Sequence, residues 1–173
     1  MKQLFVILCI FLFSACSENE TAEQPKINWN QDKSVSFNKE LAIEEELQIS
    51  MYVERNFRWK FEKTGTGLRI CYLEKGKGQQ AKVGDYVQVE SRYELIDGTL
   101  CYETKSDELE SFRVDKSDIE TGVQEAIKKM HVGDKVKLII PFRLAQGLVG
   151  DRKQIPPLST LIVDLYLISI GNE

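Results

Sequence analysis

Apolar and polar residues alternate along much of the C-terminal two thirds of the chain, and this alternation predicts β-strands. It is strictest over residues 87–95, after which the dipeptide Asp97-Gly98 predicts a tight hairpin. The predicted strands, in chain order, are residues 68–74, 87–95, 99–104 with a continuation at 112–114, 135–140 and 160–170. Apolar residues at helical spacing occur between the third and fourth of these. The pattern therefore predicts an antiparallel sheet with one helix against it, an α+β fold.

Two helices are predicted. The helix inside the sheet region covers residues 117–130, with Ser117 or Asp118 as its N-cap. The other covers residues 38–56, with Asn38 as its N-cap, and carries an apolar stripe formed by Ile43, Leu47 and Met51 at spacings of four. Two interpretations of the stripe are open. It packs on the neighbouring domain, or it forms a dimerisation or partner-binding surface.

The first residues predict an export signal. A short basic start precedes an apolar run of about ten residues, which is too short to span a bilayer. The run ends in Phe13-Ser14-Ala15-Cys16, which is similar to a bacterial lipobox, so residues 1–15 are predicted to be removed and Cys16 to be acylated. The alternative is an ordinary secretory signal with an incidental cysteine. Residues 16–37 are polar and predict a disordered, flexible tether.

Composition narrows the function classes. The 173 residues carry a formal net charge of −4 and no basic run, which argues against a nucleic-acid partner. His131 is the only histidine, and Cys71 and Cys101 are the only cysteines after the predicted lipidation site. These residues do not form a metal-ligand pattern, so neither a metal nor another cofactor is expected. Both thiols are expected to be free and buried.

Seven short motifs follow one another between Val87 and Leu161. They are Val87-x-Val89, Leu95-x-Asp97-Gly98, Ile119-x-x-Gly122, Met130-x-Val132-Gly133-Asp134, Ile140-Pro141, Ala145-x-Gly147 and Ile155-Pro156-Pro157-x-x-Thr160-Leu161. Their order and spacing resemble the FKBP-type peptidyl-prolyl cis–trans isomerase family. Residues 63–173 are therefore identified as a domain of that family, preceded by a helical segment at 38–62. The lead-in Thr64-Gly65-Thr66-Gly67 resembles the lipoprotein and periplasmic branch, in which gliding-motility-associated lipoproteins are one candidate group.

The resemblance implies a five-stranded antiparallel sheet wrapped around the helix at 119–129. In that strand order Cys71 and Cys101 lie at opposite edges, so no disulfide between them is expected. The resemblance also implies a proline-binding pocket without a cofactor. The positions that match the family's pocket are Ser91, Cys101, Tyr102, Glu110, Ile119, Glu120, Val123, Gln146 and Val163. Most of them stand where the family has aromatic rings, and the Ile119-Glu120 pair keeps the backbone N–H that holds the substrate carbonyl.

Two functions follow as hypotheses. The first is a lipid-anchored isomerase of the cell envelope, at the outer membrane, that acts on proline-containing segments of envelope proteins. The second is a non-catalytic chaperone or binding module that uses the loop at residues 142–158 on a partner. Tyr102 has two interpretations as well, a replacement wall of the pocket or an exposed aromatic at the sheet edge.

Overall fold

A computed structural model describes residues 30–105 and 107–171 of the chain. The predicted signal at 1–15, Cys16 and most of the predicted tether lie outside these residues. From Asn38 onward the chain forms one compact unit. Within the described residues, none of the helices combines the length and apolar character that a membrane span requires.

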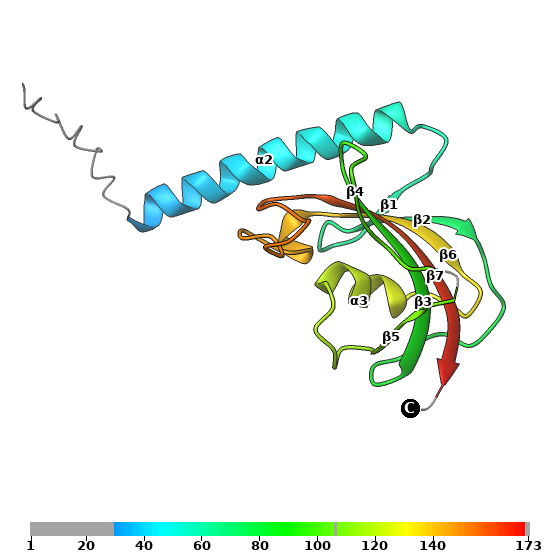
Figure 1. The fold of residues 1–173 in the computed structure, drawn as a ribbon. Coiled ribbons are helices and arrows are strands. Elements are labelled where there is room, and N and C mark those ends of the chain that lie inside the picture. The colour runs from blue at the N-terminus through cyan, green and yellow to red at the C-terminus, as the bar shows by residue number, and fades with distance from the viewer. Residues whose placement is uncertain (1–29, 106, 172–173) are drawn as a thin grey trace, which may run out of the picture. The chain divides into compact units, whose positions relative to one another are not determined.

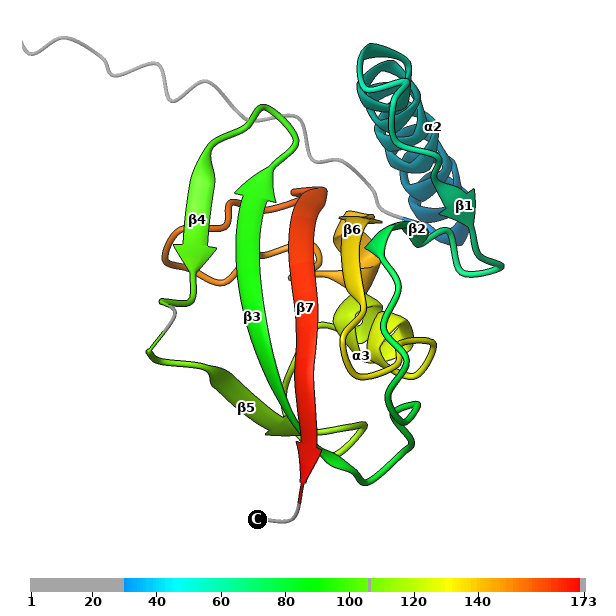
Figure 2. The same ribbon diagram turned by 90° about the vertical axis from the view of Figure 1, so that its right-hand side faces the viewer.

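An antiparallel sheet is the main element of this unit, with the strand order β1-β2-β6-β7-β3-β4 and β5 also paired with β3 (Figures 1 and 2). The strands are β1 (Glu62–Lys63), β2 (Arg69–Glu74), β3 (Tyr86–Leu95), β4 (Leu100–Glu103), β5 (Glu110–Arg113), β6 (Lys135–Ile140) and β7 (Leu161–Gly171). The long strands β3 and β7 pair over their whole length and form the centre of the sheet. Cys71 on β2 and Cys101 on β4 are free thiols on strands separated by β6, β7 and β3.

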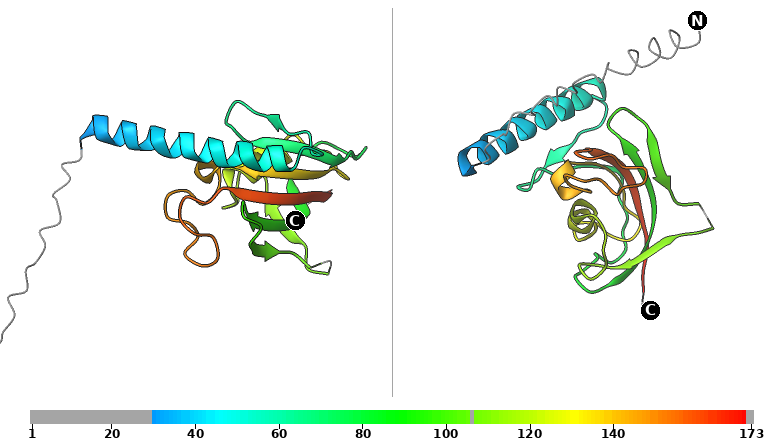
Figure 3. Two further views of the ribbon diagram at one scale, coloured as in Figure 1. Left: turned by 90° about the horizontal axis from the view of Figure 1, so that it is seen from above. Right: turned by 60° about the vertical axis from the view of Figure 1, so that its left-hand side comes forward.

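The short helix α3 (Thr121–Ile127) lies in the hollow of the curved sheet (Figures 1 and 3). Val123, Ala126 and Ile127 are fully buried there, among side chains that alternate inward from the strands. Gly122 allows the helix to approach β6 closely, because a Cβ at that position would lie 2.4 Å from Cγ2 of Ile140. The predicted arrangement of one helix against the concave side of the sheet is confirmed.

Two details of this region differ from the prediction. The sheet has seven strands where five were expected, because β1 adds a short edge and the return strand divides into β4 and β5. Helix α3 begins at Thr121, so Ser117 and Asp118 do not cap it, and its N-cap residue Glu120 makes no side-chain cap. The side chain of Gln124 accepts from the Asp115 amide and donates to the Ser117 carbonyl, which holds the preceding turn outside the helix.

Helix α2 (Gln31–Arg55) begins seven residues before the predicted start. The side chain of Asn30 accepts a hydrogen bond from the Lys33 amide at 2.9 Å, so Asn30 is the N-terminal cap and the prediction of Asn38 is wrong. Residues 31–37, assigned to the tether from their polarity, are helical. They contain neither proline nor glycine, so no helix-breaking residue separates Gln31 from the predicted start at Asn38.

The face of α2 that packs on the sheet also differs from the prediction. Glu45 and Ile49 are buried, and Ile49 forms a small second core with Ile139 and Ile162. The predicted stripe is exposed, with 60% of Ile43, 60% of Leu47 and 51% of Met51 accessible to solvent. The interpretation of the stripe as the packing face is therefore wrong.

Candidate functional site

A cavity of about 320 Å³ opens on the concave side of the sheet, between strands β3, β4 and β5 and the start of helix α3. This volume is within the range of small ligand pockets. The residues that line it are Ser91, Tyr93, Tyr102, Glu103, Thr104, Glu110, Asp118, Ile119 and Glu120. The cavity is the candidate functional site.

Five of the nine predicted pocket positions line this cavity, namely Ser91, Tyr102, Glu110, Ile119 and Glu120. Gln146 does not line it but reaches its rim, because its Nε2 donates to Oε1 of Glu120 at 2.7 Å. The remaining three, Cys101, Val123 and Val163, belong to the hydrophobic core and are at most 6% exposed. Their placement in the pocket is therefore corrected. Where the family has large rings, these small side chains are enclosed in the core and do not reach the cavity.

Four lining residues were missed by the sequence analysis, namely Tyr93, Glu103, Thr104 and Asp118. Tyr93 could have been predicted from the strand pattern. It lies two residues after Ser91, and residues two apart in a strand share a face, so both point to the same side of β3. Tyr102 both lines the cavity and donates a short hydrogen bond to Asp151, so of its two interpretations the structure favours the pocket wall.

Hydrogen bonds inside the cavity converge on two carboxylates. The Ser91 hydroxyl donates to Oε2 of Glu110 at 2.8 Å, while the other oxygen of Glu110 has no partner among the described residues. The Tyr93 hydroxyl lies 3.5 Å from Oε2 of Glu120, longer than an ordinary O–H···O hydrogen bond. Tyr93 is only 6% exposed, so its phenol is a buried polar group whose hydrogen bond to Glu120 is long.

The surroundings shift the protonation of these groups. Burial raises the pKa of Glu110, and the negative charge of Glu120 adds to this effect although the hydrogen bond from Ser91 opposes it. Burial, followed by the charges of Glu120 and Glu110, raises the pKa of Tyr93 well above its usual value. Both shifts mean that negative charge is costly in this cavity.

Replacing Glu110 with glutamine is expected to raise the free energy of unfolding at neutral pH. Because burial raises the pKa of Glu110 in the fold, the ionised side chain destabilises the native state above that pKa. The penalty is relieved as the pH falls through the folded pKa toward the unfolded value of about 4.3. Urea unfolding at a series of pH values should show a gain for Glu110→Gln at pH 7 that disappears below pH ~4. An equal gain at every pH would contradict this assignment.

The loop that borders the cavity, residues 142–158, is held at its middle and at its base. In the middle, Tyr102 donates to Asp151, whose Oδ1 accepts from the Ile155 amide at 2.9 Å. At the base, Oε1 of Glu45 on α2 accepts from the Phe142 amide at 2.6 Å and from the Thr160 hydroxyl at 2.7 Å. Helix α2 thus fixes the base of a loop that begins 97 residues later in the chain.

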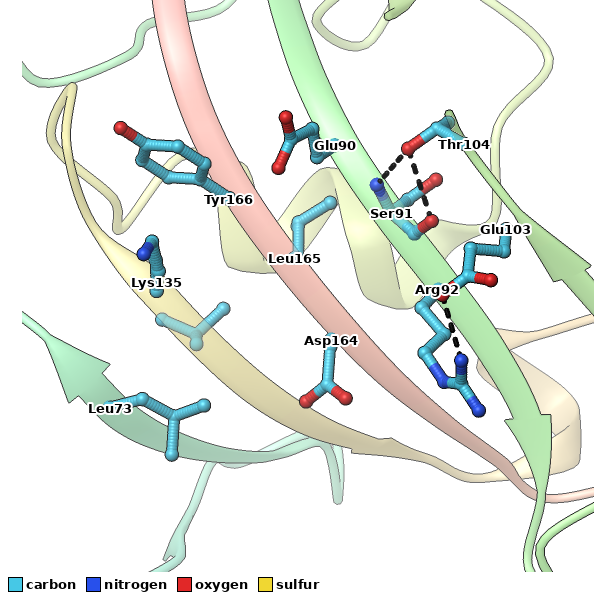
Figure 4. A pocket seen from close by; sticks show the side chains of 11 residues that line it. Leu73, Glu90, Ser91, Arg92, Glu103, Thr104, Lys135, Asp164, Leu165 and Tyr166 are labelled. Atoms are coloured by element: carbon cyan, nitrogen blue, oxygen red, sulfur yellow. Dashed lines mark hydrogen bonds and ion pairs between the residues drawn. The ribbon is translucent and has the colours of Figure 1, made fainter. Parts of the chain in front are cut away.

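A second hollow, of about 260 Å³, lies on the other face of the sheet (Figure 4). Its charges are largely matched within the protein. Arg92 pairs with Glu94 at 2.5 Å and with Glu103 at 2.7 Å, and Lys135 pairs with Glu74 at 3.0 Å. Paired surface charges of this kind are typical of a solvated face. In the concave cavity, by contrast, Glu110, Glu120 and Asp118 have no cationic partner among the described residues.

The described residues contain no group of three or more His, Cys, Asp or Glu side chains that could hold a metal ion. What the cavity offers is a buried phenol, a hydroxyl, an apolar wall at Ile119 and carboxylates, beside a curved sheet that encloses a helix. Such an arrangement defines a binding pocket on an FKBP-like α+β domain.

Comparison with known proteins places this domain in a family. The model of the FKBP-type peptidyl-prolyl cis-trans isomerase family matches residues 77–168, more than half of the chain. The chain belongs to that family.

Individual relatives agree with this assignment. The FKBP-type peptidyl-prolyl cis-trans isomerase FkpA of Escherichia coli K12 is 37% identical over 132 residues, which cover 75% of this chain and 47% of the relative. FK506-binding protein 2 of Yarrowia lipolytica is 37% identical over 97 residues, 55% of this chain and 67% of the relative. The crystal structure of FkpA from Escherichia coli is similar with a TM-score of 0.65 and 28% identity, covering 98% of this chain and 81% of that one. The chain thus spans about half the length of the curated E. coli relative.

Proposed function

We propose that this protein is a peptidyl-prolyl cis–trans isomerase that assists protein folding in the bacterial cell envelope. The observation that carries the proposal is the cavity between β3, β4, β5 and α3, to which five of the positions matching the family's pocket contribute. The similarity to E. coli FkpA, named as an isomerase of this type, supports the same activity.

The chemistry needs a shaped pocket and no nucleophile. Rotation about an X–Pro bond has a barrier of about 18–20 kcal/mol and takes tens to hundreds of seconds unaided. A pocket accelerates it by binding the twisted amide better than either planar form. Tyr93, Tyr102 and Ile119 supply walls for a proline ring. The backbone N–H of Glu120 has no partner among the described residues, so it is available to bind the substrate carbonyl.

Exchange between the cis and trans forms of proline tetrapeptides tests the activity. With micromolar protein, the exchange rate measured by NMR or by a protease-coupled assay is expected to exceed the spontaneous rate at least tenfold. The uncatalysed reaction in the same buffer is the baseline. No acceleration with any peptide in the series would refute the isomerase function and leave the binding-module function.

That second function, a chaperone or binding module, is favoured by one separate feature. The stripe of Ile43, Leu47 and Met51 on α2 is more than half exposed, and contiguous apolar surface of this kind is typical of interaction sites. The two functions are compatible, because the stripe and the cavity involve different residues.

We further infer that the protein is tethered to the outer membrane through lipid on Cys16, from the sequence Phe13-Ser14-Ala15-Cys16. Replacing Cys16 with serine is expected to move the protein from the membrane fraction to the soluble fraction of the envelope, because the lipid would be absent. Fractionation and immunoblotting measure this. Membrane association that persists in the variant would contradict the anchor.

A further inference from the structure

The cavity carries negative charge that the protein itself does not neutralise. Of the four carboxylates that line it, only Glu103 has a cationic partner among the described residues, the guanidinium of Arg92 at 2.7 Å. Glu110, Glu120 and Asp118 form no ion pair with any residue that the structure describes. No lysine, arginine or histidine is part of the described lining of the cavity.

The opposite face of the sheet provides the contrast. There Arg92 and Lys135 are paired with glutamates, and Nζ of Lys137 lies 2.5 Å from Asp164 and 4.7 Å from the centre of the Trp59 ring. Figure 4 shows the side chains of Arg92, Lys135 and Asp164 on the outer surface of β3, β6 and β7, with the helix behind the sheet. Lys135 and Lys137 therefore lie on the other face of the sheet from the cavity, and Arg92 contacts the cavity lining only through Glu103.

Two nearly buried hydroxyls add directional acceptors to this charge. Ser91 is 5% exposed and Tyr93 is 6% exposed, and both belong to the cavity lining. The Tyr93 hydroxyl donates toward Oε2 of Glu120 at 3.5 Å, and a phenol oxygen that donates still has lone pairs with which it can accept a hydrogen bond from a ligand. An ammonium or guanidinium group presents three to five donors and no acceptor, which matches a site with carboxylate, hydroxyl and phenol oxygens.

We propose that the cavity selects prolyl peptides that carry a lysine or arginine next to the proline. Glu110 and Glu120 bind the cation, with the Tyr93 oxygen as a further acceptor, while Ile119 and Tyr102 contact the proline ring. The inference rests on the proposed isomerase function, because it assumes that a prolyl peptide binds in this cavity. It names the class of peptide that this same site selects. Asp118, at the rim, attracts the same charge before contact.

A matched peptide series tests the selection. Tetrapeptides carry lysine, leucine or glutamate immediately before the proline, and a second set carries the same three residues immediately after it. The lysine peptide of at least one set is expected to exceed its leucine counterpart roughly tenfold in kcat/KM, and the glutamate peptide to be slower than leucine. Raising the salt concentration from about 0.05 M to about 0.5 M should reduce the lysine preference several-fold, because the interaction is electrostatic.

Variants locate the preference in the cavity. In Glu110→Gln and Glu120→Gln together, the ratio of lysine to leucine kcat/KM is expected to fall to about one. The control is Glu90→Gln, which removes a negative charge from strand β3 on the opposite face of the sheet. The control should retain the preference of the unmodified protein. A preference that survives the double variant would overturn the assignment to these residues.

If the double variant does not fold, the salt series on the unmodified protein tests the same electrostatic selection. A lysine preference unchanged by salt would overturn the proposal.

A binding measurement separates this inference from the isomerase function. Calorimetric titration with the same peptides reports selection without requiring catalysis. If no peptide is isomerised but the lysine peptide binds about tenfold more tightly than the leucine peptide, isomerisation fails and the cation site stands. If all peptides are isomerised and bound alike, the cation site is overturned and the isomerase function stands.

Discussion

Replacing Gly76 with alanine is expected to lower the free energy of unfolding by about 3 kcal/mol, the upper range for overpacked sites. A Cβ at Gly76 would lie 2.2 Å from the carbonyl oxygen of Val132 and 2.7 Å from the amide nitrogen of Asp134. These are backbone atoms of the turn before β6, so no side-chain rotation relieves the clash. Urea unfolding monitored by circular dichroism measures the change.

The turn that Gly76 contacts has little freedom to move. The Asp134 carboxylate is 3% exposed and accepts from the Gly76 amide at 2.6 Å and from the His131 amide at 2.7 Å. A shift large enough to admit a methyl group would break these bonds. Gly65→Ala is the control, because a Cβ at Gly65 meets no atom within 4 Å. The control is expected to change stability by less than about 0.5 kcal/mol, and equal effects of the two substitutions would contradict the steric argument.

Replacing Glu45 with alanine is expected to cost about 3 kcal/mol as well, because buried hydrogen-bond donors lose their acceptor. The Phe142 amide and the Thr160 hydroxyl are left unpaired, and each unpaired buried donor costs about 1–3 kcal/mol. Both bonds go to the same oxygen, Oε1, which glutamine can supply. Glu45→Gln should therefore lose only about 1 kcal/mol, mainly the ion pair with Arg143 at 3.4 Å.

Equilibrium unfolding in urea measures the free energy of unfolding of the unmodified protein, Glu45→Gln and Glu45→Ala, which is expected to fall in that order. Glu44→Ala, on the exposed side of the same helix, is the control. Faster hydrogen exchange at the Phe142 amide in Glu45→Ala would show that the base of the loop has opened. If alanine and glutamine were equally destabilising, the hydrogen bonds to Oε1 would not be the cause. The outcome also decides whether α2 supports the loop that borders the cavity.

Local sequence patterns were sufficient to predict most strands of the sheet. The period-two alternation of residues 87–95 and the Asp97-Gly98 turn located β3 and its hairpin, because a strand that is buried on one face alternates by necessity. The spacing of the seven motifs also located α3 in the concave side of the sheet. Each of these features depends on residues close together in sequence or on a spacing that the whole family shares.

The face of α2 could not be predicted in the same way. Hydrophobicity alone favours Ile43, Leu47 and Met51, yet the buried side chains are Ile49 and the charged Glu45. The carboxylate of Glu45 is buried because its partners Phe142 and Thr160 lie 97 and 115 residues further along the chain. The stretch of sequence around the helix does not contain these partners, so it could not predict that Glu45 is buried.

The sequence by itself determined the fold and the family, because strand periodicity and motif spacing are properties of the chain. Only the tertiary structure decided that Val123 and Val163 are in the core and that Tyr93 lines the cavity. Whether a side chain reaches a cavity or ends below it depends on the sizes of all its neighbours in space, and packing of that kind is settled only when the sheet closes around the helix.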